Sequence, residues 1–149
     1  MKLYTFKTTQ FIPADLQTCW DFFSSPGNLQ KITPPSMGFL ITSEPEPAMY
    51  AGQIISYKVK PLAGIAITWV TEITQVKEKS FFIDEQRFGP YKFWHHKHFF
   101  REAEGGVEMT DLVHYAIPFG IFGRLGHFMI KKKLQEIFDY RNTVIKKMF

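Results

Sequence analysis

Cysteine is almost absent from this sequence: Cys19 is the only one in 149 residues. A single cysteine excludes a disulfide within the chain and fits a reducing compartment. Long apolar runs are also missing. None approaches the roughly 20 residues that cross a bilayer, and the opening "MKLYTFKTTQFIPAD" lacks the continuous apolar core of a signal peptide. These absences predict a cytoplasmic protein.

Signatures for cofactors and nucleic acids are missing as well. Gly120, Gly123 and Gly126 recur every third residue, but no lysine signature of a phosphate loop accompanies them. The formal net charge of +4 is mild, and no RNA-binding motif occurs. We expect no cofactor and no nucleic-acid partner. The lysines at 131–133 and 146–147 fit a solvated helix face and allow at most transient contact with a membrane surface. No pattern indicates the oligomeric state.

Aromatic residues are plentiful, with 16 Phe, 6 Tyr and 3 Trp making up 17% of the chain. The hydrophobic fraction as a whole is an ordinary 45%. Some of the aromatic surplus can therefore line a cavity instead of filling a core.

The order of local patterns predicts an α+β fold. Residues 2–12 alternate as a strand, and Leu16, Cys19, Trp20 and Phe23 form one apolar helix face. A second short helix opens at Pro26. Five strand patterns then follow across short turns, at 53–64, 65–78, 80–91, 92–106 and 107–118, which favours an antiparallel meander.

After Pro118 the apolar period changes to three or four residues, which predicts one helix of roughly 28 residues. A long amphipathic helix laid across a curved sheet buries the concave face and tends to leave a cavity. The sequence predicts that Ile121, Leu125, Phe128 or Met129 lines this cavity. Nothing marks a domain boundary, so residues 1–149 form one predicted domain.

Three segments carry a resemblance to a known group: "FIPADLQTCWDFFSSPGNLQKITPP", "FIDEQRFGPYKFWHHKHFF" and "MTDLVHYAIPFG". They resemble the START-like superfamily, also called SRPBCC, and within it the polyketide cyclase/dehydrase-type, ligand-binding subgroup. The resemblance implies the helix-grip fold, in which a curved antiparallel sheet of about seven strands wraps round a long C-terminal helix. It implies chemistry poorly, because the superfamily spans lipid carriers, hormone receptors and aromatases.

The run "WHHKHFF" at 94–100 holds three of the five histidines. Side chains alternate along a strand, so Trp94, His96, His98 and Phe100 share one face. The opposite face carries Lys97 and Arg101 and suits solvent. We therefore predict that His96 and His98 point inward. The resembling subgroup has Trp, His, His and Phe at alternate positions, which supports the same assignment.

The flanking strand patterns add further polar groups to that inner face. Alternation places Phe82, Asp84 and Gln86 inward on one, and Met109, Asp111, Val113 and Tyr115 inward on the other. Because a buried carboxylate needs a partner, we predict that at least one of the two histidines lies within hydrogen-bonding reach of Asp84, Asp111 or Tyr115.

Four interpretations of this cluster stay open. It can be a satisfied buried polar group, or it can orient an apolar ligand that has one polar end. It can also perform acid–base catalysis through His96, His98, Asp84 and Asp111. A metal site is the fourth, but the chain has no cysteine cluster and no helical His-Glu-x-x-His motif, and we predict no bound metal.

The preferred function is the binding of a small, largely hydrophobic ligand, such as a lipid, a polyketide or an aromatic molecule, between sheet and C-terminal helix. The alternatives are a cyclase, dehydratase or aromatase-type enzyme using the same cavity without a cofactor, and an interaction module without a ligand. The predicted ligand-binding residues are Trp69, Phe82, Asp84, Gln86, Trp94, His96, His98, Phe100, Asp111, Tyr115, Leu125 and Phe128.

Overall fold

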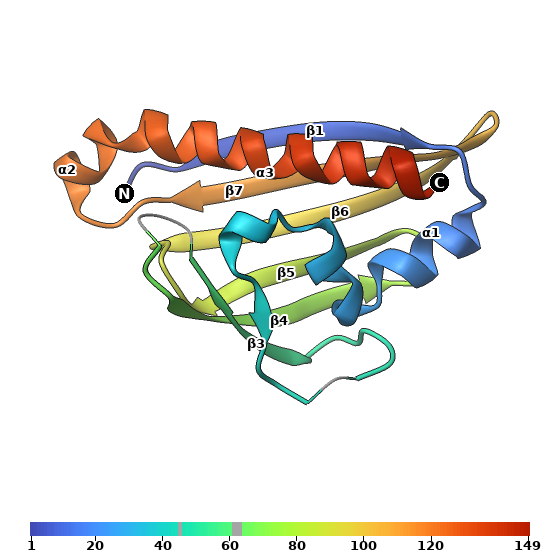
Figure 1. Cartoon of the computed structure of the whole chain (residues 1–149), viewed down its shortest axis with the longest axis horizontal. Coiled ribbons are helices and arrows are strands. Elements are labelled where there is room, and N and C mark those ends of the chain that lie inside the picture. Colours follow the sequence, from blue (N-terminus) through green and yellow to red (C-terminus); the bar gives the residue numbers. More distant parts are fainter. Residues whose placement is uncertain (45, 61–63) are drawn as a thin grey trace.

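The computed structural model describes residues 1–44, 46–60 and 64–149 (Figure 1). Its elements are β1 (Tyr4–Ile12), α1 (Leu16–Phe23), the 3₁₀ helices η1 (Pro26–Ile32) and η2 (Pro35–Met37), β2 (Leu40–Ile41), β3 (Ile54–Val59), β4 (Ile67–Lys77), β5 (Phe81–Phe88), β6 (Phe93–Ala103), β7 (Gly106–Ala116), α2 (Gly120–Leu125) and α3 (His127–Met148).

The strands form one seven-stranded sheet in the order β1-β7-β6-β5-β4-β3-β2, and the neighbouring strands pair antiparallel. The α+β helix-grip architecture predicted from the sequence is therefore confirmed. Only β2, which is two residues long, had no strand pattern of its own. The register between β4 and β5 shifts twice, after Val70 and after Ile73. Such irregularities bend a strand and help a sheet to curve.

The helix α3 packs on the concave face, along β1 and β7 (Figure 1). Its buried residues are Leu134, Phe138, Arg141 and Ile145, at the three- and four-residue spacing of one helix face. Leu134 and Phe138 pack against Phe6 and Val113. In the other core cluster, Ile145 meets residues from β5, β6, β7 and α1.

The short helices close the rest of the concave side. Asp15 caps α1 by accepting a hydrogen bond from the backbone N–H of Thr18 at 2.9 Å. Cys19 and Trp20 are buried on the inner face of α1, and Trp20 meets Phe82 and Phe100 edge-on. Burial raises the pKa of the Cys19 thiol to about 11, which suits an inert core residue. In the described ranges, no helix combines the length and apolarity needed to cross a membrane.

The expected single helix after Pro118 is instead two helices, α2 and α3, which meet at Gly126. The chain turns sharply where α2 starts, so that a Cβ on Gly123 would clash with the carbonyl oxygen of Pro118. The helix α2 extends past the end of the sheet (Figure 1).

The prediction that Ile121, Leu125, Phe128 or Met129 lines the cavity is wrong, because all four side chains are at least 54% exposed. A helix can bury an apolar face only where another element lies opposite. Here the break at Gly126 and the end of the sheet leave these residues without one. The residues of α3 that line the cavity in their place are Lys133, Leu134, Ile137, Phe138 and Arg141.

Replacing Phe138 by Ala should lower the free energy of unfolding by about 3–5 kcal/mol, because it empties space between α3 and the sheet. The matched control on the same helix is Phe128→Ala, which removes an exposed ring and should cost less than about 0.5 kcal/mol. Urea denaturation followed by circular dichroism measures both. Equal losses would contradict this placement of α3.

Candidate functional site

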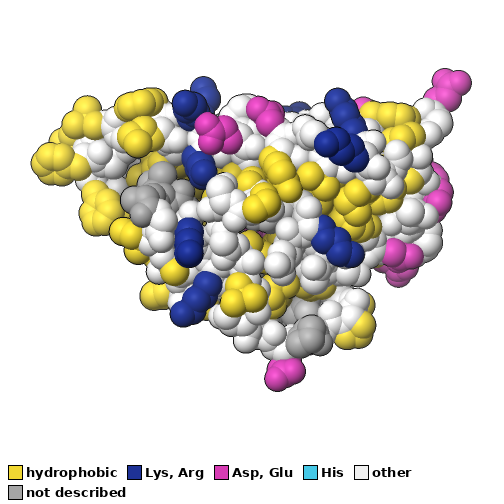
Figure 2. Space-filling view, in the orientation of Figure 1, with side chains coloured by type: hydrophobic (Ala, Val, Ile, Leu, Met, Phe, Trp, Pro, Cys, Tyr) yellow, Lys and Arg dark blue, Asp and Glu magenta, His cyan; other side chains and the backbone are white. Residues whose placement is uncertain are grey.

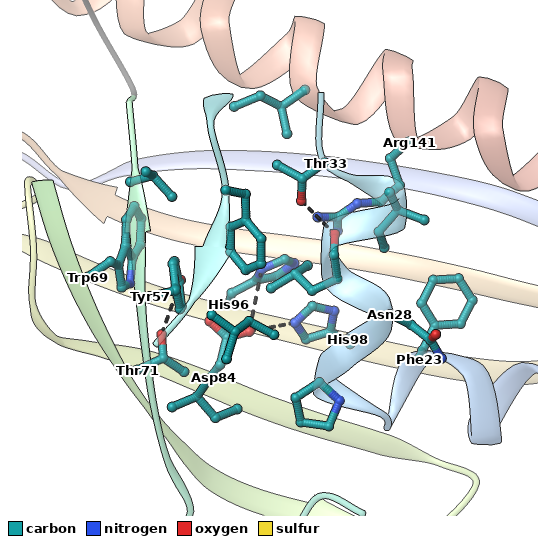
Figure 3. Close-up of a pocket in the computed structure, with 18 of the residues that line it drawn as sticks. Phe23, Asn28, Thr33, Tyr57, Trp69, Thr71, Asp84, His96, His98 and Arg141 are labelled. Atoms are coloured by element: carbon teal, nitrogen blue, oxygen red, sulfur yellow. Dashed lines mark hydrogen bonds and ion pairs between the residues drawn. The ribbon is translucent and has the colours of Figure 1, made fainter. Parts of the chain in front are cut away.

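A cavity of about 180 Å³ lies between the sheet, η1 and α3 (Figure 3). Aromatic side chains from the sheet and its loops form much of its wall, and Trp69 meets both Tyr57 and Trp94 at ring-centroid distances below 6 Å. From α3 come Leu134, Ile137 and Phe138. The cavity predicted from the aromatic surplus is therefore present, although the helical part of its wall is not the predicted one.

One wall of the cavity carries the histidine–aspartate cluster, which comprises Asp84 of β5, His96 and His98 of β6, and Asp111 of β7. The antiparallel register places Asp84 opposite His96, and Asp111 opposite His98. Both histidines and Asp111 are buried, and Asp84 is half-buried. The prediction that both imidazoles face inward is confirmed.

The hydrogen bonds of the cluster run diagonally across the three strands. His96 Nε2 lies 2.8 Å from Asp111 Oδ1, and His98 Nε2 lies 2.6 Å from Asp84 Oδ2. His98 Nδ1 is 3.1 Å from Asp111 Oδ1 without forming a hydrogen bond, and His96 Nδ1 is 3.6 Å from Asp84 Oδ2. The predicted hydrogen-bonding reach between histidine and carboxylate is confirmed for both histidines.

The two imidazoles differ in charge. Burial opposes protonation of His98, but the nearby carboxylates of Asp111 and Asp84 outweigh it and raise the pKa of His98 above its usual value. For His96, burial and then the positive charge of His98 lower the pKa, even though both carboxylates act against the change. His98 is therefore the more readily protonated of the two imidazoles, and His96 stays neutral to lower pH.

Both carboxylates stay ionised in spite of their burial. Desolvation favours the neutral acid, yet the charges and hydrogen bonds of the two histidines together lower the pKa of Asp84 and of Asp111. The rings of His96 and His98 lie 3.7 Å apart, centroid to centroid. A compact, charged and largely buried group is therefore built into the aromatic wall.

Arg141 of α3 is the site residue that the sequence analysis missed. Its side chain is buried and lines the cavity, and Figure 3 shows it reaching from the helix toward the histidines. Its Nη1 lies 4.0 Å from Asp111 Oδ1, and its guanidinium lies 4.8 Å from the centre of the Phe138 ring. Its spacing in the sequence could have indicated its burial, because it lies three residues after Phe138 and four before Ile145, on the apolar face of the helix.

Several predicted residues lie away from the cavity. Gln86 clamps the backbone of Tyr91, accepting from its N–H at 3.1 Å and donating to its carbonyl at 2.7 Å. The hydroxyl of Tyr115 is 2.8 Å from His127 Nε2, and Phe100 packs in the core beside α1. Of the predicted ligand-binding residues, the cavity wall includes Trp69, Phe82, Asp84, Trp94, His96 and His98.

Three further predicted positions need correction or qualification. Leu125 and Phe128 are exposed beyond the end of the sheet, and they do not reach the cavity. Asp111 sits behind the histidines: it does not line the cavity, but it is hydrogen-bonded to His96. Its effect on any bound molecule would pass through the imidazoles.

The cluster also has the composition of a metal site. Asp84, His96 and His98 offer donor atoms that all lie within 4.8 Å of one another. The guanidinium of Arg141, a fixed positive charge beside Asp111, disfavours a cation at this place. The absence of a metal stays a prediction.

No family model and no curated protein matches the chain, whereas solved structures do. TTHA0849 from Thermus thermophilus has a TM-score of 0.76 at 13% identity, covering 97% of this chain and 95% of that one. Ms6760 from Mycobacterium smegmatis has a TM-score of 0.69 at 16% identity, covering 100% and 99%. Ara h 8.0201 has a TM-score of 0.64 at 16% identity, covering 98% of this chain and 99% of that one.

These likenesses, at such low identities, concern the fold alone. They support the helix-grip fold over nearly the whole chain. The chemistry of the cavity has to be argued from its own residues.

The charge states can be tested by following the histidine rings during a pH titration by NMR. We expect His98 to titrate above pH 6.5 and His96 below it. In an Asp84→Asn variant, which removes one carboxylate, the pKa of His98 should fall. Two histidines titrating together near pH 6.5 would contradict the assignment.

The same shifts set the sign of the pH dependence of stability. Since folding raises the pKa of His98, its protonation stabilises the fold below pH 6.5, and this contribution is lost as the pH rises through the folded-state value. His96 acts in the opposite direction. Because folding lowers its pKa, its protonation in acid destabilises the fold.

Proposed function

We propose that the protein binds a small, largely apolar molecule in the cavity between the sheet and α3. The observation that carries this proposal is the cavity itself, an aromatic-walled space with polar groups on part of its surface. Interiors normally pack without such voids, so a wall of large rings around empty space suggests an occupant.

The volume narrows the choice among the expected ligands. A cavity of about 150 Å³ takes up a benzene molecule in a protein core, and the present cavity measures about 180 Å³. This size favours a compact molecule of one or two rings over a long acyl chain. It also counts against an interaction module without a ligand, which would gain nothing from an unfilled interior.

An enzyme of cyclase, dehydratase or aromatase type is the second candidate, and the charge asymmetry of the two histidines favours it. Nδ1 of neutral His96 can take a proton from a carbon beside a carbonyl group. His96 can then return this proton to a departing hydroxyl, so that water leaves and a double bond forms, while a positive charge on His98 stabilises the negative charge that develops. The resemblance to the polyketide cyclase/dehydrase-type subgroup agrees with this chemistry.

Native mass spectrometry of gently purified protein, with 2-naphthamide as an added neutral probe, tests the binding proposal. We expect a co-purified small molecule, or binding of the probe with one molecule per chain. Ile137→Trp, which fills the cavity from α3, should abolish binding. The control Phe128→Trp adds an indole at an exposed position of the same helix and should bind normally. Binding that survives Ile137→Trp would place the ligand elsewhere.

The variant His98→Ala distinguishes a structural role of the cluster from a role in ligand binding or proton transfer. If the cluster only supports the fold, this variant should melt at a lower temperature, with a loss of about 3 kcal/mol from a broken buried pair, and should bind the probe as before. If it orients a ligand or transfers protons, binding or turnover should be lost in protein that remains folded by circular dichroism.

A further inference from the structure

Arg141 is a buried cation without a hydrogen-bond partner. Its side chain is 9% exposed, and none of its N–H groups forms a hydrogen bond with any residue of 1–44, 46–60 or 64–149. Its Nε is fully enclosed. A guanidinium carries five donors in a fixed fork, and leaving them unpaired inside a protein is costly. Burial accordingly lowers the pKa of Arg141 although Asp111 and Asp84 act to raise it.

A second unpartnered donor lines the same space. The indole Nε1 of Trp69 is enclosed and has no acceptor among the described residues. Arg141 comes from α3 and Trp69 from β4, on different walls of the cavity (Figure 3). Both residues line the same cavity, so a ligand that brings acceptor oxygens would complement them.

The charges around the cavity leave room for a single negative charge. Arg141 and, when it is protonated, His98 balance Asp84 and Asp111, and Lys133 adds a further positive charge at the cavity wall. One guanidinium can hold one carboxylate through two parallel hydrogen bonds. A phosphate would bring more charge than this site can neutralise, and most of the remaining wall is apolar.

We infer that the ligand of this cavity is a compact aromatic carboxylic acid whose carboxylate is bound by the guanidinium of Arg141, with Trp69 Nε1 as an additional donor. This inference rests on the proposed function and adds the chemical class of the ligand. The rings of the ligand would occupy the aromatic part of the cavity.

Two probes of nearly equal shape test the inference: 2-naphthoate, which carries a carboxylate, and the neutral 2-naphthamide. At pH 7 we expect 2-naphthoate to bind wild-type protein at least about tenfold more tightly, as a charge-assisted pair in a dry site implies. Arg141→Met should remove this preference. Trp69→Phe keeps an aromatic ring and should weaken 2-naphthoate more than 2-naphthamide. Isothermal titration calorimetry measures all of these affinities.

The outcomes separate the two proposals. If wild-type protein binds the amide as tightly as the acid, or if Arg141→Met keeps the preference, the inference fails while the ligand cavity stands. Failure of both probes and the absence of a co-purified molecule would overturn the proposed function as well. Binding of 2-naphthamide by Arg141→Met shows that this variant is folded. If it does not fold, Arg141→Lys decides, because it keeps the charge but loses the fork and should reduce the preference.

An independent observation concerns the outer surface. Phe119, Ile121, Phe122, Leu125, Phe128 and Met129 form an apolar tip, in which each side chain is at least 54% exposed. Figure 2 shows apolar side chains gathered at the end of the molecule where α2 lies, with Lys and Arg beside them. Monomeric proteins rarely expose so many large apolar residues in one place.

The charge around the apolar tip indicates its partner. Between Asp111 and Glu136 the chain has no acidic residue, but it has Arg124 and the lysines at 131–133. Two copies that met tip to tip would bring these cations together. An anionic bilayer satisfies both features, because the headgroups attract the cations and the interface takes up the rings. We propose that the apolar tip docks on the surface of an anionic membrane.

Co-sedimentation with vesicles tests this docking. We expect binding to phosphatidylcholine vesicles that contain about a third phosphatidylglycerol, weaker binding at high salt, and little binding to phosphatidylcholine alone. The double variant Phe119→Ser/Phe122→Ser should lose binding at least about tenfold. The matched control is Phe11→Ser, an exposed ring near the opposite end of β1, which should bind like wild type.

Absence of binding to the anionic vesicles would overturn the docking proposal. So would a result in which the tip variants only convert a wild-type dimer to a monomer, as measured by analytical ultracentrifugation, because the partner would then be a second copy. Equal loss in Phe11→Ser and in the tip variant would also contradict it.

Discussion

Four titratable groups from three adjacent strands lie together in the interior. The rest of the site depends on the pairing of their opposite charges, which offsets the cost of burying them. Asp84, His96, His98 and Asp111 are held by the register of β5, β6 and β7. A slip of one residue would send every side chain of a strand to the other face of the sheet. The cost of an uncompensated buried charge therefore fixes this register, and with it the wall of the cavity.

The helix α3 adds a further positive charge beside the buried carboxylates. It supplies Arg141 beside Asp111, and Phe138, whose ring lies 5.8 Å from that of His96. The same face of the helix buries Leu134 in one core cluster and Ile145 in another. The packing of α3 on the sheet thus also places Arg141 in the site, and the site is complete only when α3 is docked.

The inner face of the sheet was predictable because strand alternation is strict. The period of two assigned His96, His98 and Asp111 to the interior from a few residues of pattern, and all three are buried there. The helix α1 followed from its apolar spacing, and η1 followed from Pro26. The end of the long helix next to Gly126 was not predictable in the same way, because the spacing of Leu125 and Phe128 shows an apolar face but not whether another element lies opposite.

Arg141 illustrates a second limit. Its position on an apolar helix face is visible in the sequence, but its lack of a hydrogen-bond partner is a property of three-dimensional surroundings. The same holds for Trp69, whose ring was expected at the cavity and whose unpaired N–H could not be foreseen. Both residues are candidates for ligand binding because each has a buried N–H group without an acceptor among the described residues.

The close approach of the two imidazoles affects how the cavity exchanges protons with its surroundings. At a ring-centroid separation of 3.7 Å, a charge on His98 discourages a charge on His96, so the pair takes up a second proton less readily than the first. A second proton becomes favourable only when a negative charge enters beside it. An anionic molecule would thus draw its own counter-charge from the solvent, and the occupied cavity would stay as close to neutral as the empty one.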